Sequence, residues 1–281
     1  MPKRFNASQF KNQMKREINK VVNQYERDVK KAVNKYNQAV RQHNSKVLRN
    51  RSKINAELRK LSSSSNRSTT TYRTSVFAVN SSYQTVATAY DYLDNPTPFQ
   101  EYIYSGIEQE NANNLETANV VIEDSQPDIP VYSLQDTNIM NRLSLISKDL
   151  DDRWKGALYS LNPVNPDATR HFCTSAREIF TEILDSRAKD SDVFAVFPNC
   201  DKTNNGNATR KSKIRYFLHK KGLVDNDITD FIEKDMQNIV ELFGVFNSGT
   251  HGEAGKYTFE KLAVIKKRVE DGLIFLCDIA A

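Results

Sequence analysis

The chain has little of what builds disulfide frameworks or membrane spans. Its only three cysteines, Cys173, Cys200 and Cys277, are too few and too far apart for a disulfide framework or a zinc knuckle. The longest nearly apolar run, residues 272–281, is much shorter than the about 20 residues that cross a bilayer. The N-terminus is polar and does not resemble a secretory signal. We therefore expect a soluble protein of the cytoplasm, a reducing compartment, with no membrane contact.

Hydrophobic residues are also scarce, since they make up 38% of the 281 residues, whereas an ordinary globular chain has roughly 45–50%. Part of the chain is therefore expected to lie outside any core. The length itself allows one large domain or two modest ones.

Charge is unevenly distributed along the chain. Residues 1–62 hold 17 Lys and Arg against 4 Asp and Glu, a balance of +13, and the remaining residues have a balance of −8. A basic segment of this kind is typical of a surface that contacts a polyanion or an acidic protein, although a solvated helix face would have the same composition. If it contacts nucleic acid, the contact is with phosphates and is blind to base sequence. Its candidate residues are Lys11, Lys15, Arg16, Lys20, Arg27, Lys30 and Lys31.

Residues 8–61 have the pattern of one long helix or a helical hairpin. Apolar residues from Phe10 to Val40 recur every 3.75 positions on average, close to the 11-residue repeat of coiled coils. No Gly or Pro interrupts residues 4–61, and the best place for a turn is His43-Asn44-Ser45. Because so narrow a stripe cannot fold alone, this basic arm (residues 1–61) must pair with itself, another chain or the rest of the protein. We expect a homo-oligomer formed through it.

The rest of the chain has mostly helical patterns. A Ser/Thr-rich linker at 62–71 precedes a helical middle region at 72–136, and residues 137–281 form a helical bundle. The fold class is therefore all-α, a long N-terminal helix or hairpin followed by a helical domain. Residues 124–136 are the expected domain boundary. The expected helices cover about 76–93, 99–122, 138–161, 167–184, 210–221, 227–246 and 259–279.

A histidine flanked by glycines is the first candidate for chemistry. His251 follows Gly249 and precedes Gly252, just after an expected helix end. An imidazole there can act as general acid or base on a ribose hydroxyl or a phosphodiester, because its pKa lies near neutrality. The alternative is a plain turn, in which His251 binds a carbonyl and the glycines supply positive φ.

Two further clusters are rich in basic residues. Arg170, Thr174 and Arg177 share one helical face and can hold a phosphate, unless Arg177 instead pairs with an acidic residue. The start of the helix at 210 carries Arg210, Lys211, Lys213 and Arg215, either a solvated helix start or a phosphate site.

No phosphate-binding glycine loop and no zinc-protease motif is present. Acidic runs at 149–152 and 225–235 lie on expected helices, which disfavours a metal nuclease of the restriction type. We therefore expect no metal and no cofactor.

Three blocks in the C-terminal half carry a resemblance. NPDATRHFCTSAREIFTEIL (165–184), RKSKIRYFL (210–218) and LFGVFNSGTHG (242–252) occur in that order. They resemble the family of predicted pPIWI-associating nucleases, bacterial proteins of anti-phage and genome-conflict settings, over about residues 138–279. The arrangement also resembles HEPN domains, all-α units of which many are metal-independent RNases that act as dimers.

The resemblance implies a nuclease site at His251 and Asn247, with Arg170 and Arg177 holding the phosphate. The HEPN motif places an Arg before its His, but Gly244, Val245 and Phe246 stand at those positions here. Either Arg170, Arg177 or Arg215 then supplies the guanidinium from another helix, or the domain is a non-catalytic adaptor within a defence complex, bound to a partner protein. A third alternative is a structural coiled-coil protein whose arm packs nucleic acid.

Overall fold

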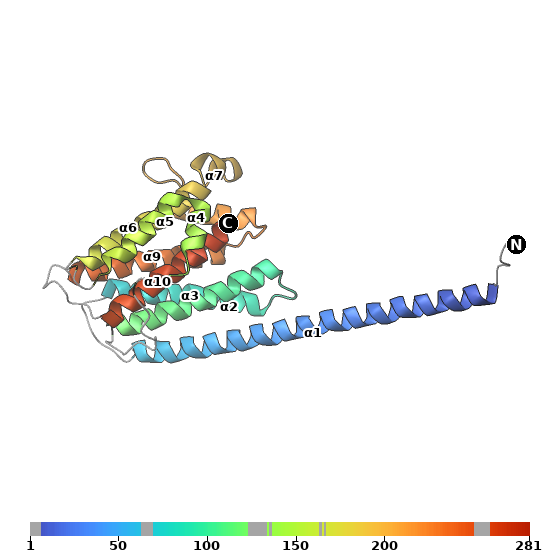
Figure 1. Ribbon diagram of the computed structural model, residues 1–281. Helices are drawn as coiled ribbons and strands as arrows, with labels where there is room; N and C mark the ends of the chain where they lie inside the picture. The colour runs from blue at the N-terminus through green and yellow to red at the C-terminus, as the bar shows by residue number, and fades with distance from the viewer. Residues whose placement is uncertain are drawn as a thin grey trace. The chain divides into compact units, whose positions relative to one another are not determined.

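In the computed structural model, residues 7–62, 70–122, 134, 137–162, 165, 167–249 and 259–281 are described. They form ten helices and no strand, which confirms the all-α class (Figure 1). Among these residues, no helix combines the length and the hydropathy needed to cross a membrane. The helices are α1 Ala7–Ser62, α2 Thr70–Asp91, α3 Pro98–Ile122, α4 Met140–Ile146, α5 Lys148–Ser160, α6 Ala168–Arg187, α7 Asp190–Val196, α8 Arg210–Lys220, α9 Asn226–Gly249 and α10 Phe259–Ala280.

The chain divides into two compact units, Met1–Arg49 and Asn50–Ala281. Helix α1 contributes its first 43 described residues to the first unit and the remainder to the second. Because α1 is one continuous helix, the alternative of a hairpin that turns at His43-Asn44-Ser45 is wrong.

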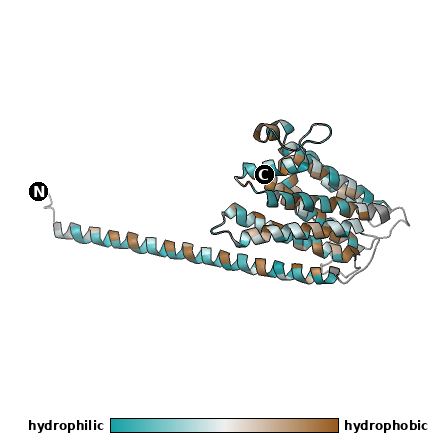
Figure 2. Ribbon diagram, turned by 180° about the vertical axis from the view of Figure 1, so that it is seen from behind, coloured by the Kyte–Doolittle hydropathy of each residue, from teal (hydrophilic) through white to brown (hydrophobic). Residues whose placement is uncertain are grey.

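The first unit is a helix whose apolar residues face solvent. Its stripe recurs along the ribbon of α1 in Figure 2, and each described member is exposed by between 37% and 70%. No described residue of this unit packs over the stripe to form a core. Helix propensity, side-chain pairs or a partner must therefore stabilise this part of α1. The exposed members are Met14, Ile18, Val21, Tyr25, Val29, Val33, Tyr36 and Val40.

The second unit has one hydrophobic core, built around α9. Helices α2, α3, α6, α8 and α10 all pack on α9, and α5 packs on α6. The core runs from Ile54 at the end of α1 to Ala280 in α10, and it includes the only tryptophan, Trp154, which is fully buried. The apolar faces that predicted these helices are the faces that meet here.

Three local features differ from the sequence-based expectation. The single helix expected over 138–161 is two helices, because Ser147 has an extended backbone (φ −160°, ψ 140°) and its hydroxyl accepts the Asp149 N–H at 3.1 Å, capping α5. Helix α7 lies between the helices expected at 167–184 and 210–221, where the sequence pattern predicts none. Helix α9 begins at Asn226 and not at 227, and Asp225 caps it, because its carboxylate accepts the N–H groups of Asp227 and Ile228.

The expected domain boundary lies in a segment of which only Leu134 is described. Helices α2 and α3, which precede this boundary, and α9 and α10, which follow it, pack against one another in the second unit. The middle region therefore shares its core with the C-terminal helices. Most of the linker at 62–71 also falls outside the described residues.

Candidate active site

Helix α6 carries the two arginines that were expected to hold a phosphate. Its buried side packs Phe172, Cys173 and Ala176 into the core, so Arg170, Thr174 and Arg177 lie exposed on the opposite side. This places the three residues on one solvent-facing strip, as their spacing predicts. Burial raises the pKa of the Cys173 thiol to about 12, while the neighbouring Arg177 guanidinium favours the thiolate.

The two arginines differ in their partners. Arg170 Nη2 lies 2.6 Å from Asp167 Oδ2, and His171 Nε2 lies 3.3 Å from the same oxygen, so both side chains share one carboxylate at the start of α6. Arg177 makes no ion pair with any described residue. Its guanidinium instead lies over the ring of Phe243 in α9, 5.7 Å from the ring centroid.

The contact with Phe243 brings Arg177 beside the last turns of α9. Asn247 follows Phe243 by four residues in the same helix, so both lie on the same side of α9. The Asn247 side chain and all of His251 lie outside what the structure describes. The described residues thus bring Arg177 to the helix end from which the chain continues to His251, four residues beyond Asn247.

The basic cluster of α8 is partly occupied by acidic partners. Lys211 Nζ lies 2.5 Å from Asp230, and the buried Lys213 lies 2.5 Å from Asp185 and 3.1 Å from Asp190. Burial opposes the charge of Lys213, but the two carboxylates outweigh it and raise its pKa. These two lysines therefore tie α8 to neighbouring elements.

The other two members of that cluster have no carboxylate within ion-pair distance among the described residues. Arg210 Nη1 donates to the side-chain oxygen of Gln237 at 3.2 Å, and burial lowers the pKa of this guanidinium. The Arg215 guanidinium lies 4.6 Å from the centroid of the Phe197 ring. Both retain charge that a phosphate could neutralise.

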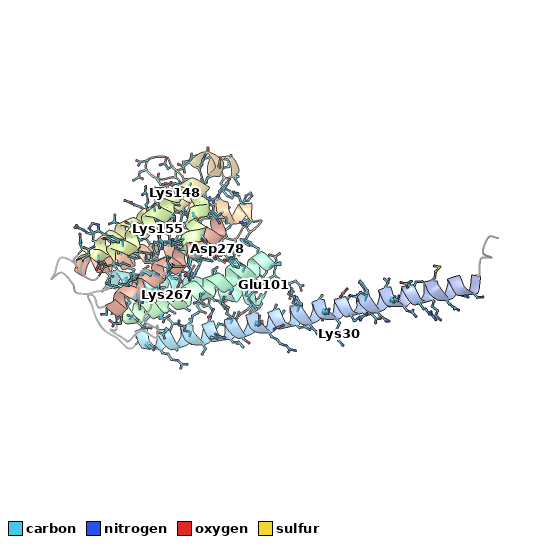
Figure 3. The ribbon with its side chains drawn as sticks, viewed as in Figure 1. Lys30, Glu101, Lys148, Lys155, Lys267 and Asp278 are labelled. Carbon is cyan, nitrogen blue, oxygen red and sulfur yellow. The ribbon has the colours of Figure 1, made fainter. Side chains whose placement is uncertain are left out.

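The candidate nucleic-acid residues of the arm are all exposed, as Lys30 in Figure 3 illustrates. Lys20 pairs with Glu17 at 2.8 Å and Arg27 donates to the Asn23 carbonyl at 3.0 Å. No pair is recorded within the described residues for Lys11, Lys15, Arg16, Lys30 and Lys31. The arm thus presents cations along the same helix as its apolar stripe.

Most carboxylates of the two acidic runs that could have bound a divalent cation are engaged in ion pairs. Asp149 pairs with Arg153 and Asp151 with Lys155, each one turn along α5, and Asp230 pairs with Lys211 and Lys234. Among the described residues, no group of three or more His, Cys, Asp or Glu side chains is placed to hold a metal ion.

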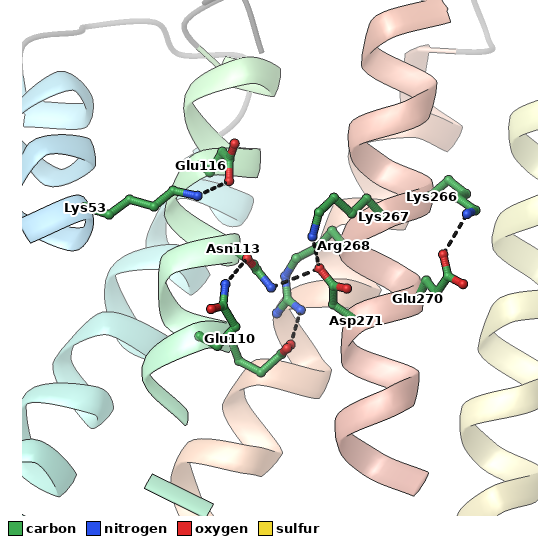
Figure 4. A network of polar contacts seen from close by, with 10 residues as sticks. Lys53, Glu110, Asn113, Glu116, Lys266, Lys267, Arg268, Glu270 and Asp271 are labelled. Carbon is green, nitrogen blue, oxygen red and sulfur yellow. Dashed lines mark hydrogen bonds and ion pairs between the residues drawn. The ribbon is translucent and has the colours of Figure 1, made fainter. Parts of the chain in front are cut away.

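A buried ion triad, consisting of Arg268, Glu110 and Asp235, is the feature that the sequence analysis missed (Figure 4 shows Arg268 and Glu110). Arg268 is fully buried, both carboxylates are 4% exposed, and Glu110 accepts from Arg268 at 2.6 Å. Burial raises the pKa of Glu110 to about 8, although Arg268 favours its ionised form. The nearby negative charge of Asp235 adds to this rise in the pKa of Glu110.

The triad lies in an unusually polar interior. Helix α3 buries Asn111, Asn114 and Asn119, and α9 buries Asn238, whose amide donates to Ser75 at 3.2 Å. The run Glu108-Gln109-Glu110-Asn111-Ala112-Asn113-Asn114 was the available signal, because its polar residues occupy every face of a helix. With Arg268 at 0% exposure, substrate has no access to the triad, so its role is to fix how α3, α9 and α10 pack.

The comparisons with known proteins concern the C-terminal half. Residues 143–276 match the family model described as predicted pPIWI-associating nuclease. Neither the search of curated proteins nor that of solved structures gave a match. The matched range contains the three blocks of the sequence resemblance and the positions Arg170, Arg177, Asn247 and His251. The similarity to the predicted pPIWI-associating nuclease family therefore covers residues 143–276, a little under half of the chain.

Proposed function

We propose that the protein is a metal-independent, RNase-like nuclease of a bacterial anti-phage defence system, with a HEPN-like catalytic domain acting in the cytoplasm. His251 is the general acid or base, Asn247 assists it, and Arg177 and Arg170 hold the scissile phosphate. The family match supports the nuclease class.

The observation that carries the proposal is the position of Arg177. It is exposed, has no carboxylate partner among the described residues, and lies over Phe243, one turn before Asn247 in α9. The HEPN-type Arg is missing from positions 244–246, so a guanidinium from a neighbouring helix has to replace it. Arg177 is the described arginine that meets this requirement.

Cleavage of the RNA backbone requires two kinds of catalytic group. When a ribose 2′-oxygen attacks the adjacent phosphorus, the 2′-hydroxyl proton must leave and the 5′-oxygen must gain one. An imidazole can perform either transfer at neutral pH. A guanidinium stabilises the negative charge that builds on the phosphate oxygens, and this electrostatic effect is the larger part of such catalysis. His251 and Arg177 supply these two functions.

Arg170 is the weaker of the two phosphate ligands. Its side chain is 64% exposed and already pairs with Asp167, so it must exchange one anion for another to bind a phosphate. Among the residues that the structure describes, Arg177 has no such pair to break. We therefore assign Arg177 the contact with the scissile phosphate and Arg170 a contact with a flanking one.

The arm serves this site by binding the backbone of the nucleic acid and by joining copies of the chain. Its exposed cations suit phosphate contacts that fall steeply with salt. Its exposed apolar stripe has the length and period of a coiled-coil surface.

The test is cleavage of labelled single-stranded RNA, tRNA and duplex DNA in EDTA and in Mg²⁺. We expect RNA cleavage in EDTA that is lost in His251→Ala. His171→Ala is the matched control, because it removes an exposed imidazole that pairs with Asp167. Cleavage that needs Mg²⁺, or that survives in His251→Ala, would contradict the proposal.

One observation favours a different function, a non-catalytic adaptor of a defence complex. Gly244, Val245 and Phe246 stand where a HEPN nuclease has its Arg, and the arm offers an uncovered stripe for a partner helix. Absence of cleavage under all conditions, together with salt-sensitive nucleic-acid binding, would select this alternative.

A further inference from the structure

A second basic island lies within the otherwise acidic part of the chain. Residues 189–221 hold 8 Lys and Arg against 3 Asp and Glu, a balance of +5, although residues 63–281 as a whole have a balance of −8. The island comprises α7, the loop after it and α8. Such a local excess within a chain segment of opposite sign marks a surface that attracts anions.

Three cations of this island, Lys202, Arg215 and Lys220, lie over aromatic rings. The Phe197 ring has the Arg215 guanidinium 4.6 Å from its centroid and the His219 ring edge-on at 5.3 Å. Lys202 lies 4.6 Å from the Phe194 centroid, and Lys220 lies 5.8 Å from that of Tyr216. Rings and positive charges therefore alternate across the junction of α7, the loop and α8.

These cations differ from the two lysines at the start of α8. Lys211 and Lys213 are neutralised by Asp230, Asp185 and Asp190. By contrast, Lys202, Arg215 and Lys220 form no ion pair with any residue that the structure describes. The buried Arg215 Nε has no hydrogen-bond partner there either. The island thus divides into lysines that serve the fold and cations whose charge is still available.

We propose that Phe194, Phe197, Lys202, Arg215, His219 and Lys220, here called the α7–α8 surface, form a binding site for single-stranded nucleic acid. Bases stack on aromatic rings and on guanidinium planes, and the lysines neutralise the phosphates between them. Paired bases of a duplex are already stacked and cannot reach the rings. The class of ligand is therefore an unpaired strand, bound without base-sequence preference.

In this proposal, the α7–α8 surface delivers an unpaired strand to the nuclease site. The proposal rests on the proposed function only for the cleavage step that follows binding. The strand contact itself would serve an adaptor equally well. Binding is therefore measured on strands that a 2′-hydroxyl-dependent nuclease cannot cut, so that failure of catalysis and failure of binding give different results.

The experiment is fluorescence anisotropy of labelled oligo(dT) and 2′-O-methyl oligo(U), with a duplex of equal length, on the full chain in EDTA. The test variant is Lys202→Ala/Lys220→Ala. The matched control is Lys155→Ala/Lys267→Ala, which removes the same charge from an exposed and a half-buried lysine that pair one turn away with Asp151 and Asp271. Figure 3 shows both control lysines on helices other than α7 and α8.

The test variant should bind single strands about tenfold more weakly, with the salt slope reduced by about 1.4 for two lost cations, while duplex binding changes less. Phe194→Leu, which keeps the charge, should weaken single-strand binding and leave the salt slope unchanged. The control pair should match the parent protein. Equal loss in test and control variants, or an equal loss for duplex and single strand, would overturn the proposal.

Discussion

The two units of this protein place apolar and charged side chains in opposite ways. In the first unit, the apolar stripe of α1 faces solvent, with Tyr25 70% exposed and Val33 50% exposed. In the second unit, apolar residues form a single core, and Arg268, Glu110 and Asp235 are buried inside it. A solvent-exposed apolar stripe favours binding of the helix to a partner that covers the stripe. A buried ion triad instead favours one particular packing of the helices that carry it.

The difference separates two sources of specificity. Burial of apolar area stabilises the second unit without direction, so its core alone would tolerate small shifts between helices. The triad does not tolerate them, because a shift leaves a charge buried without its partner. In the arm nothing comparable is buried, and its structure should respond to partners more than to single substitutions.

The largest expected effect is removal of the centre of the triad. Arg268→Met leaves Glu110 and Asp235 buried without a cation and should lower the free energy of unfolding by about 3–5 kcal/mol. Urea unfolding followed by the fluorescence of buried Trp154 measures it. Arg153→Met, which breaks only the exposed pairs with Asp149 and Glu178, should change stability little. Equal changes in the free energy of unfolding for the two substitutions would contradict a stabilising role of the buried triad.

Close packing in the second unit gives the next effect. A Cβ at Gly106 of α3 would lie 2.5 Å from the ring of Phe275 in α10, so Gly106→Ala should cost about 1–3 kcal/mol of unfolding free energy. Gly156 of α5 is also helical, but a Cβ there meets nothing within 4 Å, and Gly156→Ala should stabilise by about 0.5–1 kcal/mol. If both substitutions changed the free energy of unfolding in the same direction, in thermal or urea unfolding, α3 and α10 would not be so closely packed.

Stability should also depend on pH through Glu110. Because burial raises its pKa from 4.5 to about 8 in the folded state, the folded protein binds the proton more tightly than the unfolded chain. The contribution of Glu110 to stability is therefore fully present below pH 4.5 and is lost as the pH rises to 8. The charges that face this carboxyl group are those of Arg268, Asp235 and Asp271. In Glu110→Gln, the loss of unfolding free energy between about pH 5 and 8 should be smaller by about 1–2 kcal/mol than in the parent protein. An identical pH profile for parent and variant would contradict the assignment.

The smallest effect on stability is expected in the arm. Val29→Ser/Val33→Ser should change the unfolding of the second unit by less than about 0.5 kcal/mol, since neither residue contributes to its core. The same double variant should abolish self-association, measured by sedimentation velocity. Asn23→Ser/Asn34→Ser, off the stripe on the same helix, is the control. A parent protein that is monomeric at high concentration would remove the proposed role of the stripe.

Much of the helical pattern could be predicted from the sequence. The spacing of apolar residues predicted α3, α6, α8, α9 and α10 to within three residues, because each has one face that the core covers, whereas α2 begins six residues before the expected 76. The break at Ser147 could not be predicted this way, since the apolar stripe runs on through it and a single hydroxyl-capped turn decides the geometry. Helix α7 is seven residues long, too short to show a period.

The candidate site was predictable only in part. The exposed strip of Arg170, Thr174 and Arg177 follows from helical periodicity, but the partners of charged residues depend on which helices meet. Spacing alone could not tell that Lys213 is held by two carboxylates while Arg215 lies over Phe197. For the same reason, the pairing of Arg268 with Glu110, 158 residues earlier, required the structure.

The most direct measurement is the single-turnover rate of RNA cleavage in EDTA by Arg177→Ala, beside Arg153→Ala. Both arginines are exposed, and Arg153 is held by Asp149 and Glu178, whereas Arg177 lies over Phe243 near Asn247. If Arg177 holds the scissile phosphate, its loss should slow cleavage about 100-fold or more while strand binding changes little. Equal rates for the two variants would contradict the assignment of Arg177 to the active site.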